Sequence, residues 1–274
     1  MGVILSSEEF AGKHVFVAGG SSGINLGIAH RFAEQGAKVA ICSRSADRIE
    51  GAVADLRQHG GDVLGIPADV RDYGQVETAL KGARDAHGPI DVLISGAAGN
   101  FVAPALGMSA NAFKTVIDID LQGTFHVFRA GYDLLTRPGA SLIAISAPQA
   151  LIPYAYQAHV CAAKAGIDML VRSLAVEWGP DGVRVNSIIP GPIEGTEGME
   201  RLAPTPEAKA KATEGTPLRR YGTKREIGDA ALFLSSSMAA YVTGVNLPVD
   251  GGAVLMGSGR MGDAMADAFA HMQA

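Results

Sequence analysis

KHVFVAGGSSGINLG, residues 13–27, is the stretch from which the fold of this chain is predicted. Apolar and β-branched residues from His14 to Ala18 predict a short buried strand. Glycines and serines follow, and apolar residues then recur at helical spacing as far as Gln35. Glycines let a backbone come close to a pyrophosphate, and a helix N-terminus offers it free N–H groups. We therefore predict a phosphate-binding turn, with an ordinary tight turn as the alternative.

Strand-like and helix-like segments alternate along the rest of the chain. The strand-like segments are residues 14–18, 37–42, 63–66, 91–94, 141–146, 183–189 and 245–249. The helix-like segments are residues 24–35, 46–59, 73–87, 110–137 in two parts, 154–178 and 224–237. This alternation predicts a single α/β domain over residues 1–274, a Rossmann-like, doubly wound, seven-stranded parallel sheet with helices on both faces.

Two segments lie outside this alternation. Residues 194–217 are polar and contain three prolines, which predicts a lid of short helices over a substrate. Residues 256–274 form a C-terminal tail, in which we expect a helix from Arg260 onward and to which we assign no function.

The composition narrows the possible classes of function. A chain of 274 residues, 47% hydrophobic, can bury a large core, and its net charge of −5 argues against a nucleic-acid surface. The uncharged stretch between Pro138 and Ala163 is interrupted by prolines and polar residues, so we expect no membrane span. Its two cysteines, Cys42 and Cys161, predict reduced thiols and a cytoplasmic location.

The glycine turn resembles that of the short-chain dehydrogenase/reductase family, whose usual form is TGxxxGxG. Ala18 stands at the position of the threonine and Asn25 at that of the last glycine. Because asparagine tolerates positive φ angles, we expect the turn to survive this change. The resemblance extends from Lys13 to about Leu255 and implies an oxidoreductase with a nicotinamide cofactor.

The residues after the second strand predict which cofactor is used. An acidic residue there would bind the ribose 2′-hydroxyl of NAD, whereas Ser43 and Arg44 suit the 2′-phosphate of NADP. A solvated loop arginine is the alternative, but we expect NADPH. The resemblance implies the following cofactor-binding residues: Gly19, Ser21, Ser22, Gly23, Ile24, Ser43, Arg44, Asp69, Val70, Gly96, Ala97, Lys164, Pro190, Gly191, Ile193 and Thr196.

The family's usual catalytic residues are mostly replaced in this chain. They are a Tyr-x-x-x-Lys pair on a long helix, a serine before it and an asparagine on an earlier helix. Lys164 is present, but Val160, Ala147 and Asp120 stand at the positions of the tyrosine, serine and asparagine. Ordinary carbonyl–alcohol chemistry is therefore not expected.

Longer stretches resemble one branch of the family, the peroxisomal-type 2,4-dienoyl-CoA reductases and their bacterial relatives. They are residues 97–101, 111–116, 118–120, 159 with 163–164, 174–180, 190–193 and 195–198. That branch also lacks the tyrosine and uses an aspartate with the lysine. The resemblance implies NADPH-dependent reduction of 2,4-dienoyl-CoA to 3-enoyl-CoA, a reaction of lipid metabolism in fatty acid β-oxidation.

In this reaction a hydride reaches the δ-carbon, charge collects on the thioester oxygen, and the α-carbon is protonated. By resemblance, Asp120 assists proton delivery, directly or through water, and Lys164 holds the nicotinamide ribose. Asn100 and His159 face the thioester or its water. With them, Phe101 and Gln149 complete the substrate site, and no metal is expected. The alternatives are that Asp120 only secures a helix junction, His159 only packs, and Asn100 only shapes a turn.

Tyr156 offers a second source of the proton. It precedes Val160 by one helical turn. Enoyl reductases of this fold place a tyrosine seven residues before the lysine, where this chain has Gln157. We expect Tyr156→Phe to leave turnover largely intact and Asp120→Ala to abolish it.

Other functions stay open on the sequence. They are a trans-2-enoyl-CoA reductase and a non-catalytic dinucleotide-binding protein, while Val160 disfavours an ordinary alcohol dehydrogenase. The acyl-CoA partner requires a basic rim, for which Arg219, Arg220, Lys224 and Arg225 are candidates. By resemblance we also expect a homo-oligomer, a homotetramer.

Overall fold

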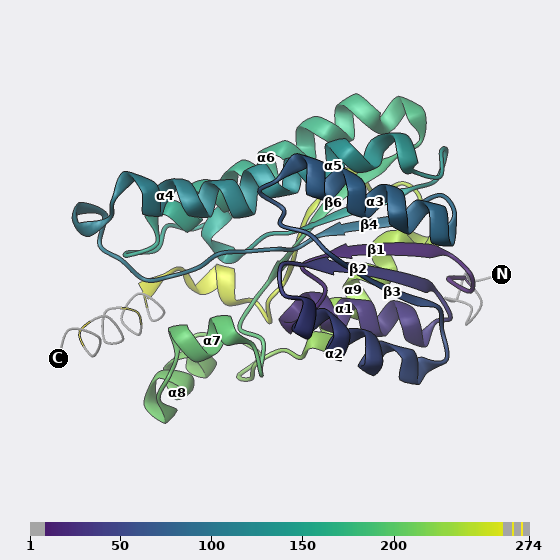
Figure 1. Ribbon diagram of the computed structural model, residues 1–274. Coiled ribbons are helices and arrows are strands. Elements are labelled where there is room, and N and C mark those ends of the chain that lie inside the picture. The colour runs from purple at the N-terminus through teal and green to yellow at the C-terminus, as the bar shows by residue number, and fades with distance from the viewer. Residues whose placement is uncertain (1–8, 260–264, 266–269, 271–274) are drawn as a thin grey trace.

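A seven-stranded sheet with helices on both faces forms the centre of the molecule (Figure 1). The computed structural model describes residues 9–259 together with residues 265 and 270. The strands are β1 (His14–Ala18), β2 (Lys38–Ser43), β3 (Val63–Pro67), β4 (Val92–Ser95), β5 (Ser141–Ile145), β6 (Arg184–Pro190) and β7 (Asn246–Val249). Each lies within one or two residues of its predicted bounds, which confirms the predicted fold class.

The order of the strands places a crevice in the middle of the sheet. That order is β3-β2-β1-β4-β5-β6-β7, and every neighbouring pair is parallel. The chain starts at the centre and winds outward in both directions, so β1 and β4 are neighbours whose connections leave on opposite sides. Ligands of such sheets bind above the carboxyl ends of these two strands.

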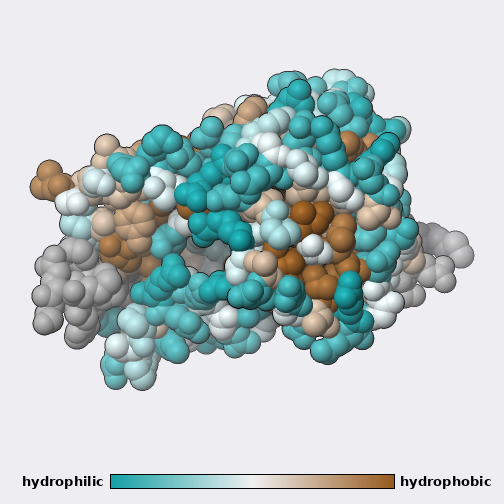
Figure 2. Space-filling view, viewed as in Figure 1, coloured by the Kyte–Doolittle hydropathy of each residue, from teal (hydrophilic) through white to brown (hydrophobic). Residues whose placement is uncertain are grey.

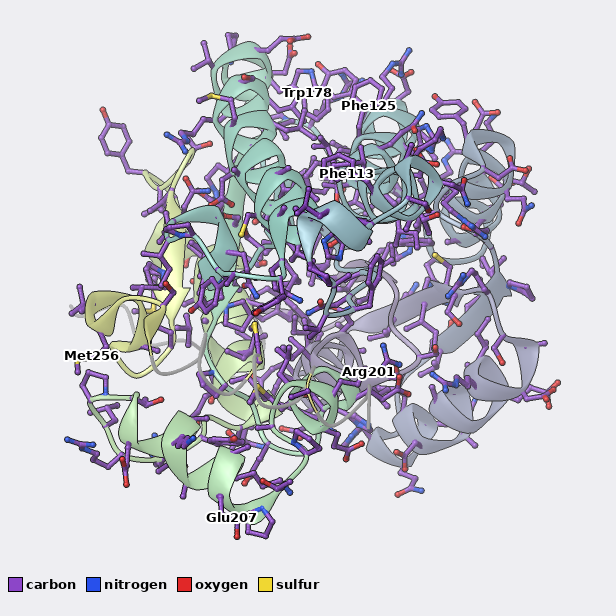
Figure 3. The ribbon with its side chains drawn as sticks, turned by 90° about the vertical axis from the view of Figure 1, so that its left-hand side faces the viewer. Phe113, Phe125, Trp178, Arg201, Glu207 and Met256 are labelled. Atoms are coloured by element: carbon purple, nitrogen blue, oxygen red, sulfur yellow. The ribbon has the colours of Figure 1, made fainter. Side chains whose placement is uncertain are left out.

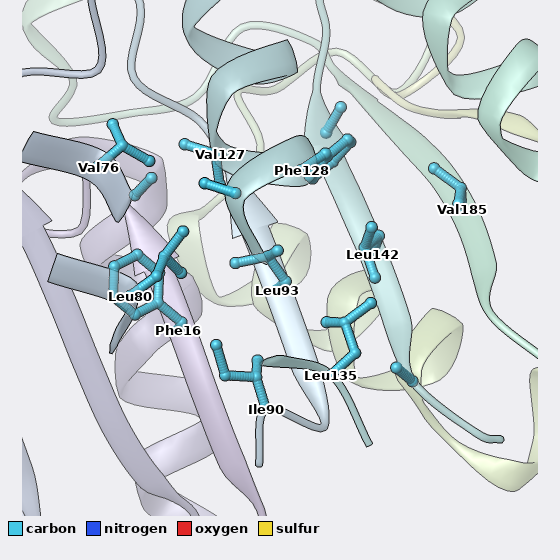
Figure 4. Packing of buried hydrophobic residues seen from close by; sticks show 14 of the residues in the cluster. Phe16, Val76, Leu80, Ile90, Leu93, Val127, Phe128, Leu135, Leu142 and Val185 are labelled. Carbon is cyan, nitrogen blue, oxygen red and sulfur yellow. The ribbon is translucent and has the colours of Figure 1, made fainter. Parts of the chain in front are cut away.

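Two groups of helices cover the sheet. Below it in Figure 1 lie α1 (Gly23–Glu34), α2 (Ala46–Leu56) and α9 (Lys224–Ser235). Above it lie α3 (Tyr73–His87), α5 (Gly123–Gly131) and α6 (Ala158–Trp178). Alternate residues of β1 supply the two cores: Val15 and Val17 pack toward the first group, Phe16 and Ala18 toward the second. Figure 4 shows part of the second core. Burial on both faces explains why the strands are almost continuously apolar.

The helix that precedes α5 is interrupted. α4 (Ala110–Val116) continues into a π-helical segment, η3 (Ile117–Gln122), before α5 begins. The predicted junction of two helical parts near residues 118–120 lies in this segment. Segments of π-helix are rare in proteins, and those that occur are often found at functional sites. Here the segment contains Asp120, which is fully buried.

The long helix α6 begins later than predicted. Its first residue is Ala158 rather than Tyr154. Tyr156 has a positive φ of 63° and Gln157 a φ of −130°, and neither angle is helical. The apolar spacing of the sequence does not reveal this break, because the two residues fit the pattern of the helix that follows.

Two short helices form an arm beyond the carboxyl ends of the strands. They are α7 (Glu197–Leu202) and α8 (Pro206–Glu214), within the segment predicted as a lid, and Figure 1 shows them projecting from the body of the molecule. Thr196 and Thr205 cap them with side-chain hydrogen bonds. Most of the predicted tail lies outside the described residues. Within those residues, no helix combines the length and apolarity needed to cross a membrane.

Short 3₁₀ turns connect several of these elements. They are η1 (Arg57–His59), η2 (Ala105–Gly107), η4 (Tyr132–Leu134), η5 (Pro148–Ala150), η6 (Gly179–Asp181), η7 (Ser237–Ala239) and η8 (Ala253–Met256).

Candidate active site

A cavity of about 1140 Å³ opens above the carboxyl ends of the strands. Its walls come from the glycine turn after β1, the loop after β4, η3, α6 and the arm. Figure 2 shows the surface hollowed between the upper helices and the arm. The position agrees with the crevice that the strand order predicts.

The glycine turn is built for close approach. Gly19 has a φ of 80°, and a Cβ atom there would lie 2.8 Å from the backbone nitrogen of Ala97. α1 follows without a side-chain cap from Ser22, so the first N–H groups of the helix face the cavity side without that competitor. A bound pyrophosphate needs this combination of missing side chains and free donors, so the turn fits a dinucleotide.

Asn25 supports the turn in a different way from the one predicted. It lies inside α1 and does not have a positive φ. Its Nδ2 instead donates to the carbonyl of Gly96 over 2.7 Å. A Cβ on Gly96 would come within 2.0 Å of Asn25 Oδ1, so these two positions fit only as a pair. Asn25 thus joins the turn after β1 to the loop after β4.

The end of β2 carries the polar groups expected at the adenosine side. Ser21 Oγ donates to Ser43 Oγ over 2.9 Å, and Arg44 beside them is exposed. A second arginine, Arg48 on α2, also lines the cavity. Its guanidinium lies 3.0 Å from the carboxylate of Glu197 on α7. Arg48 was not predicted as a site residue, although it lies only four residues after Arg44.

All of the predicted cofactor-binding residues line this one cavity. Among them, Asp69 is held by the guanidinium of Arg71, and that hydrogen bond keeps the pKa of its carboxyl below the usual range. The donor set, the glycine turn and the uncapped helix fit a nicotinamide dinucleotide.

A buried ion pair forms the floor of the cavity. Asp120 is completely buried and Lys164 is 5% exposed, and Lys164 Nζ lies 3.1 Å from Asp120 Oδ2 at an angle too poor for a hydrogen bond. Asp120 Oδ1 accepts from the backbone N–H of Gly99 over 2.7 Å. Lys164 also donates to the carbonyl of Ile145 over 3.1 Å. The loop after β4, the π-helical segment, α6 and β5 thus meet at this pair.

The position of the usual tyrosine is apolar. Val160 is 2% exposed and lines the cavity one turn before Lys164. Tyr156 is not among the lining residues, whereas Tyr154 is, and burial raises the pKa of the Tyr154 hydroxyl to about 12. The backbone carbonyl of Tyr156 accepts from the N–H of Ala103 over 3.0 Å.

Some of the predicted substrate residues line the wall of the cavity, and the others are buried behind that wall. Asn100 and Gln149 line the cavity, but His159 and Phe101 do not. The rings of His159 and Phe101 pack together with centroids 4.2 Å apart. His159 is completely buried, and burial lowers its pKa. A neutral, packed imidazole outside the wall is not placed to contact a thioester.

The predicted basic rim does not face the cavity. Arg220 pairs with Glu226 and Arg225 with Glu34, and none of the four predicted residues lines the cavity. Two basic residues of the arm line it instead, Arg201 and Lys211. In Figure 3, which looks onto the open side, Arg201 lies over the middle of the face while Glu207 lies at the outer edge of the arm. Clustering in the sequence was therefore a poor guide to the rim.

Comparisons with known proteins place this geometry among reductases. The model of the family described as "Enoyl-(Acyl carrier protein) reductase" matches residues 18–254. A peroxisomal 2,4-dienoyl-CoA reductase of Pongo abelii, whose name adds (3E)-enoyl-CoA-producing, is 44% identical over 89% of this chain and 84% of its own. One from Saccharomyces cerevisiae is 43% identical over 89% and 85%. The crystal structure of a short chain dehydrogenase from Bacillus anthracis is 36% identical, covers 89% of this chain and 97% of its own, and superimposes with a TM-score of 0.81.

Proposed function

Because the chain belongs to the short-chain dehydrogenase/reductase family, we propose that it reduces 2,4-dienoyl-CoA thioesters to 3-enoyl-CoA with NADPH. The observation that carries this proposal is the buried pair of Asp120 and Lys164. Lys164 lies one helical turn after Val160 on α6. Such a site can deliver a proton, but Val160 stands at the position where the family's usual tyrosine would meet a substrate hydroxyl. Conjugate reduction needs the proton but no such tyrosine, because no alkoxide forms. The relatives named for dienoyl-CoA reduction support the same substrate class.

The chain's residues divide the work around the cofactor. When bound, the reduced nicotinamide supplies a hydride to the δ-carbon of the dienoyl chain. Lys164 would hold the nicotinamide ribose, and the glycine turn with the start of α1 would hold the pyrophosphate. Asn25 keeps the loop after β4 against that turn through its hydrogen bond to the carbonyl of Gly96.

The proton for the α-carbon comes from the buried pair. Once the ammonium of Lys164 turns to hydrogen-bond Asp120 Oδ2, 3.1 Å away, one proton passes to that oxygen and from there to the α-carbon, directly or through water. Lys164 is then reprotonated from solvent. Asp120 Oδ1 stays fixed on the N–H of Gly99, so the other oxygen keeps its position during the transfer.

The acyl-CoA lies between the wall and the arm. Asn100 faces the thioester oxygen, where charge collects. Apolar residues of the arm and the C-terminal part line the acyl side of the cavity: Met199, Leu202, Met256 and Met265. Arg201 and Lys211 of the arm line the same cavity, and their positive charges support binding of the CoA phosphates there. We therefore propose that residues 194–217 form a lid over the substrate.

The preference for NADPH rests on the end of β2. Arg44 and Arg48 line the cavity beyond the end of β2, and Ser43 and Arg44 stand where a carboxylate would select NAD, which supports NADPH. We expect Arg44→Ala to raise the KM for NADPH by about 10-fold, because a charge-assisted contact with the phosphate is lost, and to change that for NADH little. Steady-state kinetics with both cofactors measure this. An equal loss with both would contradict the assignment.

The proposal is tested by nicotinamide absorbance. The protein is mixed with NADPH and a trans-2,trans-4-dienoyl-CoA, with the matched trans-2-enoyl-CoA as control. Consumption on the dienoyl ester alone is expected, because hydride addition at the δ-carbon needs the extended conjugation.

Two other functions give different results in that assay. The family description favours reduction of a simple enoyl thioester, which would consume NADPH on the control ester as well. A non-catalytic dinucleotide-binding protein would bind NADPH and consume none on either ester.

The assembly we propose is a homotetramer. Exposed apolar side chains lie on the three neighbouring helices α4 to α6: Phe113, Phe125, Met169 and Val176. Figure 3 shows Phe113 and Phe125 on adjoining parts of that side. Light scattering coupled to size exclusion is expected to give a tetramer's mass, and Val176→Glu to lower it. A monomeric wild-type protein would contradict the proposal.

A cytoplasmic location is also proposed. Cys42 and Cys161 are both unpaired, as expected in a reducing compartment. The named relatives in animals and yeast are peroxisomal, so fractionation of the source cells decides between the two.

A further inference from the structure

Gln157, the buried residue just before α6, has no role in the site described so far. We propose that it is a positioning residue that fixes the direction of the Asn100 amide, so that Asn100 presents its N–H₂ group to the substrate thioester. The inference rests on the proposed function and deepens it.

The side chain of Gln157 is at the centre of a chain of amides. It is completely buried. Its Nε2 donates to the backbone carbonyl of Phe101 over 2.9 Å and to Asn100 Oδ1 over 2.8 Å. Its Oε1 accepts from Gln149 Nε2 over 3.1 Å. All of its hydrogen-bonding sites except one acceptor lone pair are therefore used.

The backbone carbonyl decides which way each amide points. A carbonyl oxygen can only accept, so the nitrogen of Gln157 has to face Phe101. The second hydrogen of that nitrogen points at Asn100, so the side-chain oxygen of Asn100 has to accept it. Asn100 lines the cavity, so this leaves its Nδ2 for the cavity side. The orientation follows from a main-chain group and not from the choice between two similar amide ends.

This direction matters for the reaction. Charge collects on the thioester oxygen, and a preorganised N–H donor stabilises it, whereas an amide oxygen at the same place would repel it. An asparagine without a partner would sample both directions. Gln157 removes the second one.

The backbone around Gln157 is fixed independently. Tyr156 has a φ of 63°, a conformation uncommon for residues other than glycine and often found at functional sites. Its carbonyl accepts from Ala103, which ties the start of α6 to the loop that carries Asn100. The backbones that carry Gln157 and Asn100 are therefore held together by a bond that does not involve the side-chain amides.

The test is a double-mutant cycle on the full-length enzyme. Asn100→Ala is expected to lower kcat for the dienoyl-CoA by about 10²–10³-fold, the usual loss of one such donor. Gln157→Met keeps the length but cannot donate, and is expected to lower kcat by about 10-fold to 100-fold with the KM for NADPH unchanged. In the double variant, Gln157→Met is expected to add no further loss, because it acts only through Asn100. Gln58→Met, the same change at an exposed position outside the cavity, is the control and should change nothing.

The outcomes separate this inference from the proposed function. Losses that multiply in the double variant would show a general structural role and overturn the assignment of Gln157. Absence of dienoyl-CoA turnover by the wild-type enzyme would overturn the proposed function, and this inference with it. If Gln157→Met does not fold, Gln157→Asn, which is too short to reach both acceptors, is put through the same cycle with the same criterion.

Discussion

At the scale of single residues, the chemistry depends on a charge pair that replaces a tyrosine. Asp120 and Lys164 are both nearly inaccessible, and each has one further fixed partner in the backbone. Removing one member of such a pair leaves the other charge buried and unpaired, which costs about 3–5 kcal/mol. Stability and turnover therefore have to be measured together.

Asp120→Asn is expected to keep an acceptor for the N–H of Gly99 while it loses the proton-transferring carboxylate. We expect kcat to fall by about 10²-fold or more, since general acid catalysis contributes roughly 10²–10⁴-fold. Tyr156→Phe should leave turnover largely intact, because Tyr156 is not among the residues that line the cavity. Single-turnover kinetics, with thermal melting to check folding, decide the matter. A greater loss in Tyr156→Phe than in Asp120→Asn would contradict the account.

Much of this site could be predicted from the sequence, but not which of two neighbouring residues lines the cavity and which lies behind its wall. The resemblance to family motifs predicted Asp120, Lys164 and a set of cofactor residues, and all of them line the one cavity. These motifs did not separate Asn100, which lines the cavity, from its neighbour Phe101, which lies behind it. That difference depends on how the loop after β4 packs against α6, which no spacing in the sequence records.

At the scale of elements, an ion pair between Glu197 and Arg48 ties the arm to the proposed cofactor side of the cavity. Glu197 of α7 lies 3.0 Å from Arg48 of α2 and 3.2 Å from Arg201 of its own helix. All three side chains are more than half exposed, so the pairs contribute about 0–1 kcal/mol each. Arg48 is nevertheless shared between the arm and the place expected for the 2′-phosphate.

Glu197→Gln should release Arg48 for the cofactor. The Kd for NADPH is expected to fall by about 2-fold to 5-fold, in line with a weak exposed pair, and the Kd for NADH to stay constant. Titration of intrinsic fluorescence with each cofactor measures both values. Weaker NADPH binding in this variant would contradict the shared role of Arg48.

Element boundaries were predictable where local pattern decides them. The strands, and α3 at its bounds of Tyr73–His87, agree with the periodicity of the sequence. The start of α6 does not, because Tyr156 has a positive φ and its carbonyl accepts from Ala103 in the loop after β4, and neither feature shows in the apolar spacing. The π-helical form of residues 117–122 was equally hidden, since only a junction was visible there.

At the scale of the whole molecule, stability should depend on pH through a histidine at the base of the sheet. His14 is buried in β1, and burial lowers its pKa from 6.5 to about 4, although its Nδ1 bonds the carbonyl of Gly88. Between these values the unfolded chain binds the proton and the folded chain does not. Stability is therefore full above pH 6.5 and is lost as the pH falls toward 4.

This loss amounts to about 3 kcal/mol, since one unit of pKa corresponds to about 1.4 kcal/mol. Urea unfolding at several pH values between 4 and 7.5 measures it. In His14→Asn, whose amide can still donate to Gly88, the slope of unfolding free energy against pH should be flatter over this range. An unchanged slope would assign the pH dependence to other groups.

The central claim is that a hydride reaches the δ-carbon of a dienoyl-CoA while the α-carbon is protonated by way of Asp120. It is tested most directly by mass spectrometry and NMR of the product formed from 2,4-dienoyl-CoA with NADPH deuterated at the transferred hydrogen. The account predicts deuterium on the δ-carbon and a 3-enoyl product. Deuterium on the β-carbon, with the distal double bond intact, would contradict it and identify a simple enoyl reductase.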